Sequence, residues 1–231
     1  MANARRSRVL PTWIEWSHRL VAGLVTILVT ALAACTWWLR RGKGTGDGGS
    51  VLAYIALALL AIQIVLGAVT VKLSLPPWTV ILHLGTAMLL LATLLIAATG
   101  ASPRLRPGLG ALLLLTFVTV LLGALTANLG AASACLGFPL CNGQLVPAGN
   151  YAQHIHWTHR LFAYTLFAVT LWWAQRTRRR GPAIVFALVM LQLAVGATMV
   201  LLGLPPIMQA AHVAVGAAVW SAVVLAVMRE R

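Results

Sequence analysis

The sequence is poor in charged residues, and acidic ones are especially scarce. Charged residues make up 9% of the 231, with three aspartates and glutamates against 17 lysines and arginines. A soluble domain needs a polar shell that faces water, and a chain with 61% hydrophobic residues has too few polar side chains to form one. The composition therefore excludes a soluble globular protein. It also argues against binding to nucleic acid, because that function needs a basic face on a folded soluble domain.

Cysteine is also scarce, with three residues in the whole chain. Cys35 lies inside an apolar run, where a thiol packs as a small hydrophobic group. Cys135 and Cys141 share one loop, so we predict a disulfide between them in an oxidising compartment. Their spacing does not distinguish a structural bridge from a redox-active one. A zinc site is disfavoured, because no set of four ligands lies nearby.

Long apolar runs, by contrast, are abundant. Seven of them have about the 20 residues that a helix needs to cross a bilayer. We therefore predict an all-α integral membrane protein with about seven transmembrane helices packed into helical bundles. The predicted spans are 13–39, 51–73, 78–99, 109–129, 152–175, 182–203 and 207–228.

The loops between these runs predict the orientation in the membrane. Basic residues follow the first, third, fifth and seventh runs, which the positive-inside rule assigns to the cytoplasmic side of a bacterial-type membrane. The opposite side has two Pro-Pro turns and the uncharged loop 130–150. The basic tail at Arg5, Arg6 and Arg8 falls on the outer side by parity. Together with the odd number of helices, this tail leads us to expect a further segment before residue 1.

An internal repeat organises the chain. A shift of 129 residues aligns 57–87 with 186–216, and 11 of the 31 positions are identical. Because an even number of spans separates the copies, we expect two parallel repeats, with domains at 1–100 and 101–231. The identical pairs include Gln63/Gln192, Gly67/Gly196, Ala68/Ala197, Pro76-Pro77/Pro205-Pro206 and His83/His212.

Each repeat contains two histidines at similar predicted depth. The segment WSHRL at 16–20 is echoed by WTHRL at 157–161, which gives His18 and His159, and each Pro-Pro turn is followed by His83 or His212. Neutral imidazoles from facing helices are common axial ligands of haem in helical bundles. We therefore predict two haem sites near the outer face, His18 with His83 and His159 with His212. The alternative is that these histidines form hydrogen bonds across helices.

Three further residues lie beside these histidines. Arg19 and Arg160 directly follow a predicted ligand, where a guanidinium could pair with haem propionates. Glu15 is the only acid at the outer membrane edge and precedes His18 by three residues, on the same helix face. Its counterpart in the second repeat is His156, so we expect one reactive site and one supporting site. The alternative for Glu15 is an acid placed at a helix N-terminus to favour the dipole.

Taken together, these motifs resemble the haem A synthase family. The resemblance rests on EWSHR at 15–19, HLG at 83–85, CLGFPLCNG at 135–143, HWTHR at 156–160, and His212 with Gly216. Members of that family are eight-helix proteins made of two four-helix halves, and they oxidise a ring methyl of haem O to a formyl group. This chain departs from the pattern in lacking the first helix and the first cysteine pair. We expect either an internal start or a shortened member of the family.

The resemblance implies a role for each motif. His159 and His212 would bind a haem b cofactor in the C-terminal half. His18 and His83 would define the site of the substrate haem O in the N-terminal half, with Glu15 as the reactive carboxylate. Cys135 and Cys141 would be the outer cysteine pair of the second half.

Two other functions and a set of partners complete the expectations. A non-enzymatic carrier with two b haems would use the same histidine pairs, and a transporter would share the parallel repeats but needs broken helices. The expected partners are haem O, membrane lipid, haem O synthase and terminal oxidase assembly factors. An electron donor is also required, and the sequence does not identify it. No nucleic acid is expected.

Overall fold

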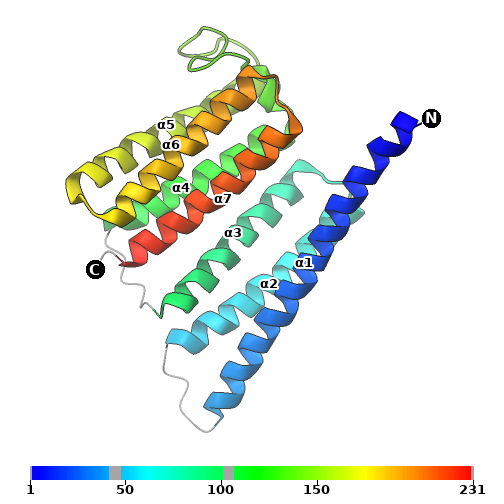
Figure 1. Cartoon of the computed structure of the whole chain (residues 1–231), viewed down its shortest axis with the longest axis vertical. Helices are drawn as coiled ribbons and strands as arrows, with labels where there is room; N and C mark the ends of the chain where they lie inside the picture. Colours follow the sequence, from blue (N-terminus) through cyan, green and yellow to red (C-terminus); the bar gives the residue numbers. More distant parts are fainter. Residues whose placement is uncertain (1, 42–47, 101–106, 230–231) are drawn as a thin grey trace. The chain divides into compact units, whose positions relative to one another are not determined.

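The computed structural model describes residues 2–41, 48–100 and 107–229, and the described chain is all-α (Figure 1). The predicted fold class is confirmed. Seven α-helices and one 3-10 helix follow one another along the chain. They are α1 (Ala2–Arg40), α2 (Gly48–Lys72), α3 (Pro77–Thr99), α4 (Pro107–Asn128), η1 (Ala131–Ala134), α5 (Tyr151–Thr177), α6 (Arg180–Leu201) and α7 (Pro206–Arg229).

Six of the seven α-helices in the described ranges are long and apolar enough to cross a membrane. The exception is α5, although its 27 residues exceed the length that a span requires. Histidine, glutamine and arginine side chains in its first three turns lower its mean hydropathy. Both helices that flank it in the chain, α4 and α6, are among the six. Polar side chains of α5 form hydrogen bonds to other parts of the protein.

The start of α1 differs from the prediction. The helix begins at Ala2 rather than at residue 13, because backbone hydrogen bonding continues beyond the apolar run from which the start was predicted. Glu15 and His18 therefore lie well inside the helix, and the first turn of α1 contains no acidic residue. Glu15 is not a helix N-terminal acid, so the dipole explanation for it is wrong.

The chain divides into two compact units, Met1–Ala61 and Ile62–Arg231. In the second unit, α4 packs on α5, α5 on α6, α6 on α7, and α7 back on α4 (Figure 1). This order makes a four-helix bundle with α5 and α7 at opposite corners. Helix α3 covers the side formed by α4 and α7, and the indole Nε1 of Trp220 donates to the Met88 carbonyl at 2.8 Å.

The apolar core of this bundle occupies only one of its ends. Its buried residues come from the beginning of α4 and α6 and from the end of α5 and α7. Since consecutive helices are antiparallel, these segments lie at the same end, and the opposite end is left for other residues. The core residues are Leu112, Leu166, Trp173, Val185, Val189, Val219, Val223, Ala226, Val227 and Met228.

The two Pro-Pro turns have the same backbone structure. In the turn before α3 the Leu75 amide donates to the Thr70 carbonyl at 2.8 Å, and before α7 the Leu204 amide donates to the Met199 carbonyl at 2.8 Å. Both leucines have left-handed backbones, with φ of 60° and 65°. The repeat therefore extends from sequence to local structure.

Two predictions about organisation stay predictions. The proposed boundary between the halves adjoins residues 101–106, which lie outside the described ranges. Several basic residues that support the predicted orientation also lie outside them, namely Lys43, Arg104, Arg106 and Arg231.

Candidate functional site

The end of the bundle that the apolar core leaves free contains two histidines. His159 lies in the third turn of α5 and His212 in the second turn of α7, at opposite corners of the bundle. The two rings are near enough for their charges to interact. In each ring Nδ1 is buried and has no hydrogen-bond partner among the described residues. A buried polar atom of this kind is rare in native proteins and calls for a ligand or another explanation.

Glycines make room for these rings. A Cβ atom added to Gly123 of α4 would lie 3.0 Å from Cε1 of His159, and one added to Gly196 of α6 would lie 2.9 Å from Cε1 of His212. Each imidazole therefore packs directly on the backbone of the α-helix that precedes its own in the chain. The first repeat has the same arrangement, since a Cβ at Gly67 would lie 3.2 Å from Cε1 of His83.

A glutamine is paired with one histidine in each repeat. The Gln63 amide nitrogen lies 3.1 Å from Nε2 of His83, and the Gln192 amide nitrogen lies 3.2 Å from Nε2 of His212. These pairs occupy equivalent positions, because both members are separated by the same 129-residue shift. The amide orients the ring from the side opposite the helix to which the histidine belongs.

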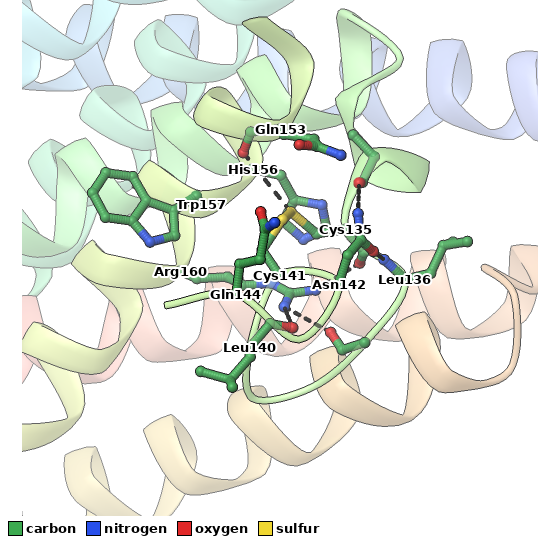
Figure 2. Close-up of a disulfide and its surroundings, with 12 residues drawn as sticks. Cys135, Leu136, Leu140, Cys141, Asn142, Gln144, Gln153, His156, Trp157 and Arg160 are labelled. Atoms are coloured by element: carbon green, nitrogen blue, oxygen red, sulfur yellow. Dashed lines mark hydrogen bonds between the residues drawn. A yellow bond between two sulfur atoms is a disulfide. The ribbon is translucent and has the colours of Figure 1, made fainter. Parts of the chain in front are cut away.

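The loop between η1 and α5 is held by side chains of α5 (Figure 2). Arg160, which is buried, donates through Nη1 to the carbonyls of Gly137 and Leu140 at 2.7 and 3.1 Å and through Nη2 to that of Cys135 at 2.8 Å. The ring nitrogen Nδ1 of His156 lies 3.1 Å from the Ala131 carbonyl.

Two more α5 side chains extend this attachment. Trp157 donates through Nε1 to the Leu145 carbonyl, and the Tyr164 hydroxyl donates to the Pro139 carbonyl, each at 2.8 Å. The first three turns of α5 therefore serve two purposes. His159 faces the bundle, while its polar neighbours bind the backbone of the loop.

Comparison with known proteins agrees with this arrangement. The family model described as cytochrome oxidase assembly protein matches residues 6–224. The chain belongs to this family. Among curated relatives, the haem A synthase of Symbiobacterium thermophilum is 31% identical over 219 residues, covering 81% of this chain and 71% of the relative.

Two further relatives carry the same name. The haem A synthase of Exiguobacterium sibiricum is 33% identical over 210 residues, covering 83% of this chain and 69% of the relative. That of Mesorhizobium japonicum is 29% identical over 232 residues, covering 87% and 64%. The chain thus spans about two thirds of the length of these family members.

The structure tests some of the predicted site residues of this cytochrome oxidase assembly protein and leaves others open. The disulfide between Cys135 and Cys141 is confirmed. In the first unit, Arg19 forms an exposed ion pair with Glu15, with 2.6 Å between nitrogen and oxygen. His18 is exposed in the same unit. His18 and His83 belong to different units, so their pairing stays a prediction, as do the haem-ligand roles of all four histidines.

His159 and His212 fit a haem. The hydrogen bonding of each ring is incomplete among the described residues, and each ring occupies the space that a glycine leaves on the neighbouring helix. Axial ligation requires only two imidazoles, so the fit does not depend on a larger cluster of metal ligands. The buried Arg160 already has three carbonyl partners. Its predicted contact with a propionate is untested.

Sequence reasoning missed three features of this site. The repeat contained the signal for Gln63 and Gln192, since both are identical between the copies, but the 20 residues that separate each glutamine from its histidine concealed the contact. Gly123 lies in α4, which has no counterpart in the first repeat, so no internal comparison could identify it. The binding of Arg160 to loop carbonyls had no signal, because carbonyl acceptors are not encoded by residue type.

We predict that Gly196→Ala displaces the His212 ring. The added Cβ would lie 2.9 Å from Cε1, closer than real contacts allow, so the ring must move. Haem content of the purified protein, measured by absorbance, should fall at least severalfold. Alanine is the better helix former by about 1 kcal/mol, so helix destabilisation would not explain a loss. Gly110→Ala is the matched control, since no atom lies within 4 Å of its added Cβ. Equal haem content in the two variants would contradict the packing argument.

We also predict that Arg160→Leu opens the loop. Removal of a charged donor from buried carbonyls costs about 1.5–3 kcal/mol, which corresponds to a change of at least about tenfold in loop opening. The Cys135–Cys141 disulfide should therefore be reduced by dithiothreitol about tenfold faster, as followed by thiol alkylation and mass spectrometry. Arg176→Leu, at the far end of α5 and exposed, serves as the control. A reduction rate unaffected by Arg160→Leu would mean that the other loop contacts suffice.

Proposed function

We propose that this chain acts in haem A synthesis by oxidising a ring methyl of haem O to a formyl group. The observation that carries the proposal is the pair of imidazole rings, on His159 and His212, at the end of the bundle that the apolar core leaves free, in a chain of this family. Its relatives carry the name haem A synthase. His159 and His212 would hold the haem at this end of the bundle, because the other end is filled with packed apolar residues.

In this proposal His159 and His212 hold a haem b in the C-terminal half. When bound, haem b supplies a one-electron redox centre. Gly123 and Gly196 allow the rings to lie close to the neighbouring helices, and Gln192 orients the His212 ring. Arg160 fixes the loop that leads into α5, the helix to which His159 belongs.

The N-terminal half holds haem O as substrate. His18 and His83 are the proposed ligands, and the His83 ring packs on Gly67 of α2. With water as the source of the oxygen atom, oxidation of a methyl to a formyl group releases four protons and four electrons, so the site needs a proton acceptor. Glu15 has this role in the proposal, and Arg19 holds its carboxylate at 2.6 Å.

The proposed partners follow from the reaction. Haem O must be supplied by an enzyme that makes it, and the product must reach terminal oxidase assembly factors. An electron donor is expected from the sequence; with water as the oxygen source, the four electrons released must instead leave the protein through an acceptor in the membrane or at its surface.

The function is tested by purifying the protein from cells that make haem O, extracting its haem and identifying each species by chromatography and mass. We expect haem b together with haem O, or with a hydroxylated or formyl derivative of it. Haem b alone, with two bis-histidine spectra, would favour the di-haem electron carrier. A protein with no haem would contradict both functions.

A variant of the proposed acid tests the chemistry. Glu15→Ala should leave the haem content unchanged and lower the conversion of haem O by about 100-fold, the usual scale for loss of a proton-transfer group. Glu15→Asp keeps the carboxylate and should retain part of the activity. The measurement is the ratio of haem A to haem O in extracts. An undiminished ratio in Glu15→Ala would remove Glu15 from the mechanism.

A further inference from the structure

The two glutamine–histidine pairs differ in one neighbouring residue. In the first repeat the hydroxyl of Thr86, one helical turn after His83, bonds to the outer oxygen of the Gln63 amide. The same hydroxyl lies 2.9 Å from the Leu82 carbonyl. A hydroxyl can both donate and accept, so it satisfies the outer end of the amide in either orientation of that amide. His83, Gln63 and Thr86 therefore form a connected trio.

The second repeat lacks this hydroxyl. Val215 stands three residues after His212, at the position that Thr86 holds after His83. The outer oxygen of Gln192, Oε1, is buried and has no hydrogen-bond partner in the described part of the chain. Gly216 lies beside the same amide, where an added Cβ would be 3.3 Å from its nitrogen. At the outer end of the amide, the pair of Gln192 and His212 is thus unsatisfied where the pair of Gln63 and His83 is satisfied.

A haem iron and the glutamine amide compete for the same ring nitrogen. Nε2 is the nitrogen away from Cβ, so it is the one that a large planar ligand can approach. In both repeats this nitrogen faces the glutamine amide. It cannot bind the iron and keep the amide as its partner. The affinity for haem therefore depends on how well the hydrogen bonds of the empty site are satisfied.

We propose that Thr86 makes the haem at His83 exchangeable and that its replacement by Val215 makes the haem at His212 permanent. Without haem, the first trio keeps its hydrogen bonds, so the empty site is stable and releases its ligand readily. The second site without haem leaves Gln192 Oε1 buried and unpaired, which disfavours the empty state. When haem binds Nε2 of His212, the Gln192 amide loses the ring as its partner and is free to rotate. One buried unpaired polar group shifts such an equilibrium by about tenfold.

The proposed difference in haem release between the two sites rests on the proposed function. In that function the first site must take up substrate and release product while the second retains its cofactor. At this position the two repeats differ by one residue, Thr86 in the first and Val215 in the second. Reciprocal exchange of these residues therefore tests it directly, with each repeat as the control for the other.

The experiment uses wild-type protein, Thr86→Val and Val215→Thr, each purified from cells that make haem O. Excess apomyoglobin in detergent serves as the haem acceptor, and the haem that leaves is identified by chromatography at successive times. Thr86→Val should slow the loss of haem O and its products about tenfold without changing the loss of haem b. Val215→Thr should speed the loss of haem b about tenfold without changing the loss of haem O. Thr86→Ser keeps the hydroxyl and should behave as wild type.

Each outcome has a distinct meaning. Faster loss of haem O from Thr86→Val would show that the glutamine supports the bound haem, and would overturn the proposal. Unchanged rates in both exchanged variants would also overturn it, while leaving the proposed function intact. A wild-type protein without haem would contradict the proposed function and this inference together. Helix content by circular dichroism checks folding, and Val215→Thr tests the idea independently if Thr86→Val is poorly folded.

Discussion

The structure depends on one constraint, the placement of imidazole rings against helix backbone inside an apolar bundle. A polar ring nitrogen buried away from water costs free energy unless something binds it. The protein accepts this cost at His159 and His212, and gives each ring a glycine to lie on. The cost would be avoided by an aliphatic residue at either position. In the proposed function both rings are held there to bind haem, and the glycines give them room.

The duplicated unit has diverged at defined points. The same arginine follows the first histidine in both copies, yet Arg19 pairs with Glu15 at the surface whereas Arg160 is buried against loop carbonyls. Glu15 is replaced by His156, which also contacts that loop region. The second copy thus uses its polar residues for rigid support. The first copy keeps an exposed carboxylate, which is the group that chemistry on a substrate requires.

Much of this arrangement could be predicted from the sequence. The helices α2 to α7 were predicted within a few residues because apolar length determines a span and Pro-Pro marks a start. The histidines stood out because the repeat placed them at equivalent positions. The start of α1 could not be predicted, since hydropathy reports membrane contact rather than backbone hydrogen bonding. Gly123 and the partners of Arg160 depend on contacts between distant segments, which no local pattern encodes.

The central claim is that His159 and His212 together ligate one haem. Electron paramagnetic resonance of the oxidised protein tests it in material from cells that make haem b but no haem O, so that the proposed substrate site at His18 and His83 adds no signal of its own. The wild type is compared with His159→Ala, His212→Ala and His154→Ala. His154 is an exposed histidine in α5 and is the control. The account predicts a low-spin bis-imidazole signal in the wild type and in His154→Ala, and its loss or conversion to high spin in each of the other two variants. Persistence of the same low-spin signal in both His159→Ala and His212→Ala would contradict the account.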